Sequence, residues 1–491
     1  MADPIVEGKP GYASPVVDNV SASSSELPQN VSDAGSREAF LVSFTPAEDK
    51  SIMRKVDRRF LLLIGILYMT KNIDYQNAAS VKVLQVGESR NVLTELSMTP
   101  DEYNWVQSVY FISYIIFEIP SNLLLKKMSP RIWQSRIILT WGIVLACHAA
   151  IPNKQTYYAL RFLLGMMEAG MFPGIAAQLC SCVVGSLLAY GISYMNGMCG
   201  MSAWRWVYLL EGLYTILLAV VVYLVLPDYP KSPRTSKGLS PREQEYLEVR
   251  LSENAPLTNE GAFFMINQLM VNLGGYGLSW YLPTITTNLG FAGLPRNQLL
   301  NIPPAAASVL AIIFAGNFLN RAYVTRPAFT QPIMAGMTVF FVLFLAVSSK
   351  ASIYVACVLG TMFYSVYFIP FWAWRSSTLQ GMTGTAFILA FQSCIGQVGG
   401  VIGPQLFQSK FAHNGYKTSF GICAAAIIVG WLANLWTWLL TRNIEWDVRR
   451  IKRLRITAGK DGAVYADDDV RVHEERRFYG GLGRKAEAAI V

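Results

Sequence analysis

Charged side chains occur inside long apolar stretches of this sequence, where they could bind or carry ions. Within the stretch near residues 60 to 78 lie Lys71, Asp74 and Asn77. A charge at the centre of a bilayer costs at least about 2.5 kcal/mol, so each such residue needs a partner or a purpose. The spacing of three predicts that Lys71 and Asp74 pair on one helical face as part of a solute-binding site. The alternative is that the helix ends near Thr70 and these residues lie among lipid headgroups.

Three carboxylates and one guanidinium lie nearer the centres of other apolar stretches. They are Glu118, Arg161, Glu168 and Glu211. Arg161 and Glu168 are seven residues apart, so they share a helical face but need partners on other helices. One interpretation is that these residues form ion pairs that fix the packing of helices. The other is that one carboxylate takes up and releases a coupling proton.

The second half of the chain carries mostly uncharged polar groups in its apolar stretches. They are Asn267, Gln268, Asn272, Asn317, Gln392 and Gln397. We predict that Asn272 and Gln392 contact a solute, although ordinary hydrogen bonds between helices would explain the same residues. A third group, Gly399, Gly400, Gly403 and Pro404, predicts a gate where helices approach closely and bend. Tight packing alone is the alternative.

Twelve apolar stretches must position these residues, and each is long enough to cross about 30 Å of hydrocarbon as a helix. They lie near 60–78, 103–125, 133–151, 157–179, 183–200, 204–226, 262–289, 302–320, 328–348, 351–373, 384–409 and 418–440. A polar, basic stretch divides them into six and six. The sequence therefore predicts an all-α integral membrane protein with two six-helix halves, between which a solute site forms.

Composition and charge agree with that prediction. The chain is 53% hydrophobic and only 15% charged, which is typical of a membrane protein. The net charge of +9 does not indicate nucleic-acid binding, because the basic residues lie at the ends of apolar stretches. Most of the 41 Lys and Arg residues fall on one side if both termini are cytosolic, which is the topology we predict.

Five segments follow from this organisation. We predict a disordered cytosolic tail (1–56), a first half (57–226), a cytoplasmic linker (227–261), a second half (262–441) and a basic cytosolic tail (442–491). No nucleophile–base or metal-ligand spacing is present, so we predict no enzymatic activity, cofactor or metal. The expected partners are a small solute, protons and the lipid bilayer, and we expect a monomer.

Several motifs together are characteristic of one family. They are Asp57-Arg58-Arg59, Asp74 with Asn77, Phe117-Glu118-Ile119-Pro120-Ser121-Asn122, Trp141-Gly142, Arg161-Phe162, Glu168-Ala169-Gly170 with Pro173-Gly174, Trp204-Arg205-Trp206, and Gly399-Gly400 to Gly403-Pro404. From about Asp57 to Arg442 the chain resembles the major facilitator superfamily and, within it, the fungal anion:cation symporters that include allantoate, nicotinate and pantothenate permeases. The resemblance implies a fold of major facilitator type and proton-coupled uptake of small organic anions by alternating access, with the plasma membrane as the expected location.

The chain also departs from that family. Members commonly carry Arg where this chain has Tyr75, so we assign the predicted anion-binding role to Lys71. Two spans of about 20 residues almost exhaust the segment from Tyr157 to Gly200, which leaves no basic loop between the fourth and fifth spans. A similar shortening precedes the seventh span. These features keep two alternatives to uptake open, namely an exporter of a secondary metabolite and a transport-dead, truncated paralogue.

Overall fold

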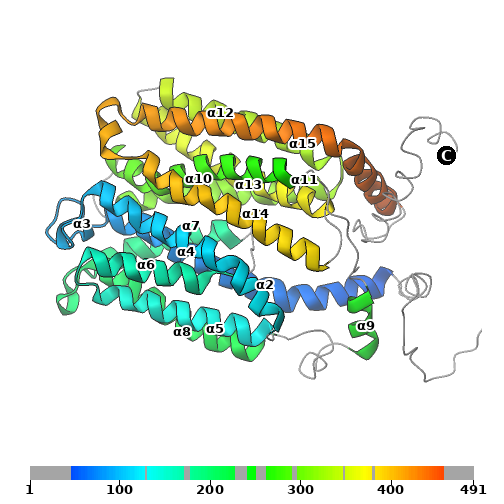
Figure 1. The fold of residues 1–491 in the computed structure, drawn as a ribbon, viewed down its shortest axis with the longest axis horizontal. Coiled ribbons are helices and arrows are strands. Elements are labelled where there is room, and N and C mark those ends of the chain that lie inside the picture. Colours follow the sequence, from blue (N-terminus) through cyan, green and yellow to red (C-terminus); the bar gives the residue numbers. More distant parts are fainter. Residues whose placement is uncertain are drawn as a thin grey trace, which may run out of the picture. The chain divides into compact units, whose positions relative to one another are not determined.

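The computed structural model describes residues 46–127, 130–170, 177–226, 240–249, 261–289, 296–346, 349–378 and 382–457. Twelve long helices and no strand occur within those ranges (Figure 1). The helices are α2 (Pro46–Val83), α4 (Pro100–Lys127), α5 (Pro130–Cys147), α6 (Lys154–Glu168), α7 (Ala177–Ser193), α8 (Ala203–Val225), α10 (Gly261–Leu289), α11 (Ile302–Asn320), α12 (Arg326–Ala346), α13 (Lys350–Ser377), α14 (Met382–Ile402) and α15 (Lys417–Thr457). The predicted all-α fold is confirmed.

Shorter helices lie at the ends of the long ones. They are α3 (Val92–Glu95), α9 (Pro241–Val249), and the 3₁₀ turns η1 (His148–Ala150), η2 (Met198–Gly200), η4 (Arg296–Asn301), η5 (Gly403–Leu406) and η6 (Ser409–Asn414). We call the end that carries α3 and η6 the outer end, following the topology predicted from loop charge. The end that carries α9 is the inner end.

Each predicted half buries a hydrophobic core of its own. The first core is built from residues between Leu63 and Leu226, and the second from residues between Phe264 and Ile427. Trp280, on α10, is the one member of the second half that belongs to the described first core. Because the two cores are separate, each half can move as a unit, which is what a transporter that rocks between two states requires. The predicted two-half architecture is confirmed.

The outward faces of several helices are apolar. Five described stretches are long and apolar enough to cross a membrane: Ala203–Val225, Leu299–Asn320, Arg326–Ala346, Lys350–Ser377 and Lys417–Asn443. Large apolar side chains on these helices are exposed, including Leu217 at 67% and Leu310 at 69%. Such surfaces are unfavourable in water and suit hydrocarbon. The chain is therefore a multi-pass membrane protein.

Local signals in the sequence fix where helices begin. At the start of α4, the backbone N–H of Thr99 donates to Glu102 at 2.8 Å and the N–H of Glu102 donates to the Thr99 hydroxyl at 3.2 Å. This reciprocal capping box satisfies two donors that the first helical turn leaves unpaired. Asn153 caps α6 in a similar way, and an ion pair of 2.6 Å between Lys154 and Glu102 joins the two helix starts.

Several helix boundaries differ from the predicted ones. Helix α2 begins at Pro46, ahead of the boundary predicted at residue 57, and it continues without a break to Val83. The predicted ends at 179 and 200 are wrong, because α6 ends at Glu168 and α7 at Ser193. Glycines with left-handed backbone follow both ends, with φ of 87° at Gly170 and 89° at Gly197. The shortened junction that we predicted at 180–182 lies inside α7, and residues 171–176, between the described parts of α6 and α7, lie outside the described residues.

Candidate functional site

The first half contains a cluster of buried charged residues, and Lys71 of α2 faces α4 within it. The Lys71 ammonium donates to the Tyr114 hydroxyl at 2.9 Å and lies 4.5 Å from the centre of that ring. The carboxylates near enough to act on its charge are Glu168 and Glu118. Helix α2 continues well past Lys71, so the alternative in which it ends near Thr70 is wrong.

Asp74 faces a different helix, so the predicted pair with Lys71 is wrong. Its side chain is fully buried, and one oxygen accepts a hydrogen bond from Thr215 of α8 at 3.4 Å. The other oxygen has no hydrogen-bond partner among the described residues. Residues three apart on an α-helix point about 60° from each other, and here that angle directs Lys71 to α4 and Asp74 to α8. Asn77, one turn further along, is buried and its amide nitrogen also lacks a partner within the described chain.

Arg161 of α6 is fully buried among tyrosines rather than against a carboxylate. Its Nη2 donates to the Tyr208 hydroxyl at 2.6 Å, and that hydroxyl lies 2.7 Å from the hydroxyl of Tyr157. The guanidinium lies 5.3 Å from the Tyr208 ring centre and 5.6 Å from that of Tyr157. Its Nε and Nη1 atoms have no hydrogen-bond partner among the described residues. Glu211 lies near enough to interact with its charge, but no described ion pair joins the two.

The two remaining carboxylates face α4 and α14. The Tyr110 hydroxyl donates to Glu168 Oε2 at 2.5 Å, whereas Glu168 Oε1 has no described partner. Glu118 accepts a hydrogen bond from the Cys394 thiol of α14 at 3.2 Å, so it lies where the two halves meet. Sequence analysis missed Tyr110 and Tyr114. Tyr110 follows Tyr103 by seven residues, Tyr114 follows Tyr110 by four, and Glu118 follows Tyr114 by four. This spacing places all of them on one face of α4 and could have indicated the two tyrosines.

Taken together, one cluster of the first half holds two cations, the half-buried Lys71 and the buried Arg161, and four buried carboxylates on α2, α4, α6 and α8. Polar atoms without a described hydrogen-bond partner occur on Asp74, Asn77, Arg161, Glu168 and Glu211. A buried polar atom that lacks a partner costs free energy, and native structures keep few of them. This cluster can bind an anion through its cations and exchange protons through its carboxylates.

The second half provides a network of amides instead. Gln392 of α14 accepts from Arg375 Nε at 2.8 Å and donates to Gln268 of α10 at 2.8 Å. Asn272 donates to the Gly396 carbonyl at 3.0 Å and accepts from the Tyr364 hydroxyl at 3.4 Å. The network therefore contains both predicted solute ligands of this half, Asn272 and Gln392.

Arg375 belongs to this network and was missed by sequence analysis. It is only 1% exposed and lies over the Phe264 ring at 4.7 Å. Its position near the end of α13 resembled an interfacial anchor, because arginines at span ends usually reach toward headgroups. Burial by α10 and α14, which the sequence pattern does not reveal, distinguishes it.

An aromatic layer separates the charged cluster from the amide network. The Tyr75 ring of α2 lies 5.5 Å from Phe111 of α4 and 6.0 Å from Tyr276 of α10, measured between ring centres. The Tyr276 hydroxyl donates to Gln397 at 2.8 Å. Tyr75 thus brings the two halves into contact.

Hydrogen bonds close the outer end between the halves. Asn104 of α4 accepts from Lys82 at 3.2 Å and from the Trp280 indole at 2.9 Å, and it donates to the Phe407 carbonyl at 3.2 Å. Nearby, Ser409 donates to Asp101 through both its N–H and its hydroxyl. In the described part of the chain, all hydrogen bonds between α4 and the second half lie from Asp101 to Glu118, in the outer and middle parts of α4.

The predicted gate residues lie at this outer contact. A methyl group on Gly400 would come within 2.5 Å of the Phe111 ring, and one on Gly403 within 2.9 Å of the Gly277 nitrogen. Gly399 is equally close to the backbone of α10. Helix α14 ends at Ile402, and Pro404 lies in the 3₁₀ turn η5. These residues let α14 pack closely against α4 and α10, and their role as a gate stays a prediction.

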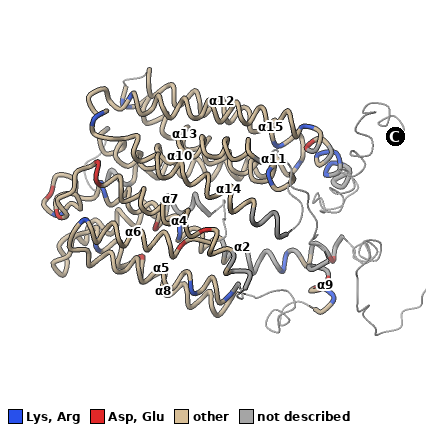
Figure 2. The backbone as a smooth tube through the Cα atoms, in the orientation of Figure 1, with Lys and Arg blue, Asp and Glu red and all other residues tan. Residues whose placement is uncertain are grey.

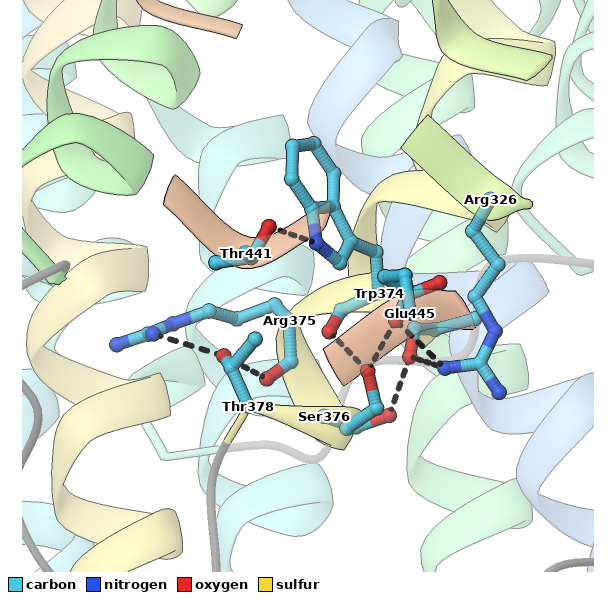
Figure 3. Close-up of polar contacts among 9 residues, drawn as sticks. Arg326, Trp374, Arg375, Ser376, Thr378, Thr441 and Glu445 are labelled. Carbon is cyan, nitrogen blue, oxygen red and sulfur yellow. Dashed lines mark hydrogen bonds and ion pairs between the residues drawn. The ribbon is translucent and has the colours of Figure 1, made fainter. Parts of the chain in front are cut away.

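A second polar cluster holds the inner ends of α12, α13 and α15 together (Figure 3). The carboxylate of Glu445, 1% exposed, accepts from the Ser377 hydroxyl at 2.5 Å and lies 3.5 Å from Arg326. Arg326 also donates to the Ala373 carbonyl at 2.7 Å. The Trp374 indole donates to the hydroxyl of Thr441, a residue of α15, at 3.1 Å. Burial raises the pKa of the Glu445 carboxyl, while Arg326 and Ser377 oppose that change.

Comparison with known proteins extends these observations. A family model described as Major Facilitator Superfamily matches residues 64–404. An MFS-type transporter of Penicillium expansum, cnsO, is 26% identical over 434 residues, covering 79% of this chain and 82% of its own. A candidate tartrate transporter of Agrobacterium vitis is 26% identical over 390 residues, covering 72% and 87%. A D-xylose–proton symporter structure shares the fold, with a TM-score of 0.57 at 13% identity and coverage of 77% and 97%.

The lengths of these alignments bear on the shortened junctions. The alignment with cnsO extends over 434 residues but takes in only 79% of this 491-residue chain, so tens of its positions have no residue here. The alignment with the Agrobacterium protein is likewise longer than the part of this chain that it covers. This chain therefore lacks internal residues that the relatives have.

With a family model matched over most of its length and a two-half helical fold, the chain belongs to the Major Facilitator Superfamily.

Proposed function

We propose that this secondary transporter takes up a small organic anion together with protons, by alternating access, at the plasma membrane. The observation that carries the proposal is the buried cluster of the first half, in which Lys71 and Arg161 lie among four carboxylates. Charges at this depth are retained where a solute or ion uses them.

The two cations supply the anion-binding groups. Arg161 has two nitrogen atoms, Nε and Nη1, without a described partner, so its guanidinium has donors left for a carboxylate. Lys71 provides a second positive charge that faces α4. A solute with a carboxylate would satisfy the Arg161 donors, which otherwise remain buried and unpaired.

Glu168 is the group that we expect to couple protons to the solute. Both Lys71 and Arg161 act on its charge, and only one of its oxygens has a described hydrogen bond, which comes from Tyr110. When Glu168 is ionised it competes with the solute for the cations. When it binds a proton it releases them, so anion binding and proton binding favour one another.

Alternating access would then break the outer contacts around Asn104 and open the solute cluster to the other side. The inner cluster around Glu445 lies wholly within the second half, so it would move as part of that half. This division assigns the moving contacts to the boundary between the halves and the fixed contacts to their interiors.

Uptake into proteoliposomes tests the proposal. A panel of radiolabelled mono- and dicarboxylates is offered at external pH 5 with internal pH 7, and then at pH 7 on both sides. We expect accumulation only with the pH gradient, and we expect Lys71→Gln to abolish it. Lys154→Gln is the matched control, because Lys154 pairs with Glu102 at the outer end, 35% exposed and away from the cluster. Uptake by the Lys71 variant at the rate of the unaltered protein would contradict the proposed site.

A transport-dead paralogue is a second candidate, favoured by the missing internal residues. Helix α6 has 15 residues and spans about 22 Å, less than the hydrocarbon thickness of about 30 Å. Thermal stabilisation by a carboxylate, without accumulation under either gradient, would identify a binding protein that does not transport. Accumulation only when the gradient is reversed would instead identify an exporter.

A further inference from the structure

Basic residues are concentrated in α15 where it continues past its membrane-crossing stretch, Lys417–Asn443 (Figure 2). From Arg442 to Arg455 the sequence holds six basic residues and two acidic ones. Arg442, Trp446, Arg450 and Arg453 are exposed, and their spacing of four, four and three places them on one helical face. We call these four residues, with Tyr323, the α15 basic surface.

The opposite face of the same helix fixes this surface in place. Glu445 and Val448 are buried at 1% and 6% exposure, and Glu445 makes the contacts with Ser377 and Arg326 described above. The inner part of α15 is therefore packed against the second half. A ligand would not have to order this helix in order to bind the arginines.

The turn between α11 and α12 completes the surface. Arg449 donates to the carbonyls of Ala322 and Tyr323 at 3.1 and 2.6 Å, which attaches this turn to α15. The Arg453 guanidinium lies 5.5 Å from the centre of the Tyr323 ring. Tyr323 is 45% exposed and Trp446 is 56% exposed, and aromatic residues of these two types prefer the headgroup level of a membrane.

An apolar path leads from this surface along α11. The Phe318 ring lies 5.7 Å from Tyr323 and 6.1 Å from Phe314, measured between centres. Phe314 and Leu310 are exposed at 67% and 69% on a helix long and apolar enough to cross the membrane. An acyl chain could lie along these side chains while its headgroup reaches the arginines.

We propose that the α15 basic surface binds an anionic phospholipid, with its phosphate held by Arg442, Arg450 and Arg453. Guanidinium groups are suited to phosphate, because they donate several hydrogen bonds in one plane. The neighbouring apolar path favours a lipid over a soluble phosphate, since only a lipid also covers Phe314 and Leu310. This binding is independent of the transported solute.

The test uses the full-length protein in detergent micelles, titrated with phosphatidylserine or with phosphatidylcholine. We expect phosphatidylserine alone to raise the thermal unfolding midpoint, and brominated phosphatidylserine to quench fluorescence that Trp446→Phe removes. Replacing Arg442, Arg450 and Arg453 together with Gln should weaken binding roughly a hundredfold, at about fivefold for each charge. The matched control replaces Lys350, Lys410 and Lys417, exposed at the outer end, with Gln and should bind like the unaltered protein.

Three results would overturn the proposal. They are equal stabilisation by phosphatidylcholine, equal stabilisation by inorganic phosphate, and unchanged affinity in the triple arginine variant. If the triple variant does not fold, Arg450→Gln alone decides, because Arg450 makes none of the described hydrogen bonds or ion pairs. It should lose affinity about fivefold, and an affinity equal to that of the unaltered protein would refute the site.

Discussion

The two halves share one architecture but bury different chemistry. The first half places Arg161 and four carboxylates at depth beside the half-buried Lys71, with hydrogen bonds that leave several of their atoms unpaired. The second half builds its corresponding interior from amides, with Arg375 joined to Gln392 and Gln268 in a chain of hydrogen bonds. An unpaired buried charge is costly, whereas a satisfied amide network stabilises one arrangement. The difference suggests that the first half carries out ion exchange and the second half recognises the neutral part of the solute.

The largest effect that would sharpen this comparison concerns the buried arginine of the first half. Arg161→Gln should abolish uptake and lower the free energy of unfolding by about 3–5 kcal/mol, because it removes a fully buried charge that acts on Glu168 and Glu211. Arg326→Gln in the second half should cost less, about 1–3 kcal/mol, since Arg326 is 24% exposed and its ion pair with Glu445 is longer, at 3.5 Å. Thermal and chemical unfolding of both variants in one detergent would measure this. Equal losses, or a larger loss for Arg326, would remove the energetic distinction between the halves.

The contact between the halves gives the next largest effect. Asn104→Ala leaves the Trp280 indole and the Phe407 carbonyl without this partner. We therefore expect the state that is closed at the outer end to lose about 1–3 kcal/mol of stability relative to the state that is open there. Spin labels at Thr94 and Lys410, both exposed near the outer end, should report a larger population at long distance. Asn317→Ala, an exposed amide on α11, serves as the control and should leave the distances unchanged. Identical distance distributions in all three proteins would show that Asn104 does not hold the outer end closed.

Close packing of α14 should produce a moderate effect. Gly400→Ala places a methyl group 2.5 Å from the Phe111 ring, so we expect a loss of about 1–3 kcal/mol from overpacking and slower uptake. Gly316→Ala is the matched change on α11, where no atom lies within 4 Å of the added carbon, and it should be neutral or slightly stabilising. Thermal unfolding and initial uptake rates would be compared. If Gly400→Ala changes neither the thermal stability nor the uptake rate, the Phe111 side chain can move to make room for the added methyl group.

The smallest effect is a difference in pH dependence between two glutamates. Burial tends to raise the pKa of Glu95 near α3, but hydrogen bonds from Ser202, Trp204 and Arg205 outweigh it and hold this pKa below 4.5. Glu95 therefore stabilises the fold above pH 4.5, and the contribution is lost as pH falls further. Burial raises the pKa of Glu445 above 4.5, so its contribution has the opposite sign and acidification from pH 7 toward 4.5 stabilises the protein.

Thermal unfolding between pH 4 and 7 would separate the two glutamates. Glu95→Gln should flatten the loss of stability at the acidic end, by less than about 1 kcal/mol because Glu95 is partly exposed. Glu445→Gln should remove the gain on acidification. Profiles of the same shape for both variants would show that these two carboxylates do not titrate differently.

Sequence reasoning predicted the helices and the residues of the charged cluster in the first half, but it did not predict which residues those side chains contact. Apolar length was enough to find the twelve spans, and intramembrane charge was enough to find Lys71, Asp74, Arg161 and Glu168. The pair between Lys71 and Asp74 was wrong, because three-residue spacing permits either contact or divergence and only the packing of α4 and α8 decides. The boundaries near Gly170 and Gly197 were wrong because hydropathy does not register a left-handed turn.

The short helix α6 has a consequence for how the protein fits its membrane. Its 15 residues span about 22 Å, whereas the stretch of α15 from Lys417 to Asn443 has 27 residues and spans about 40 Å. A bilayer must thin beside the first and accommodate the second by tilt. Because membranes along the secretory route thicken by several ångströms, such a mismatch penalises the thicker ones. At the plasma membrane, where we propose that the protein acts, this penalty is largest, and lengthening α6 should reduce it.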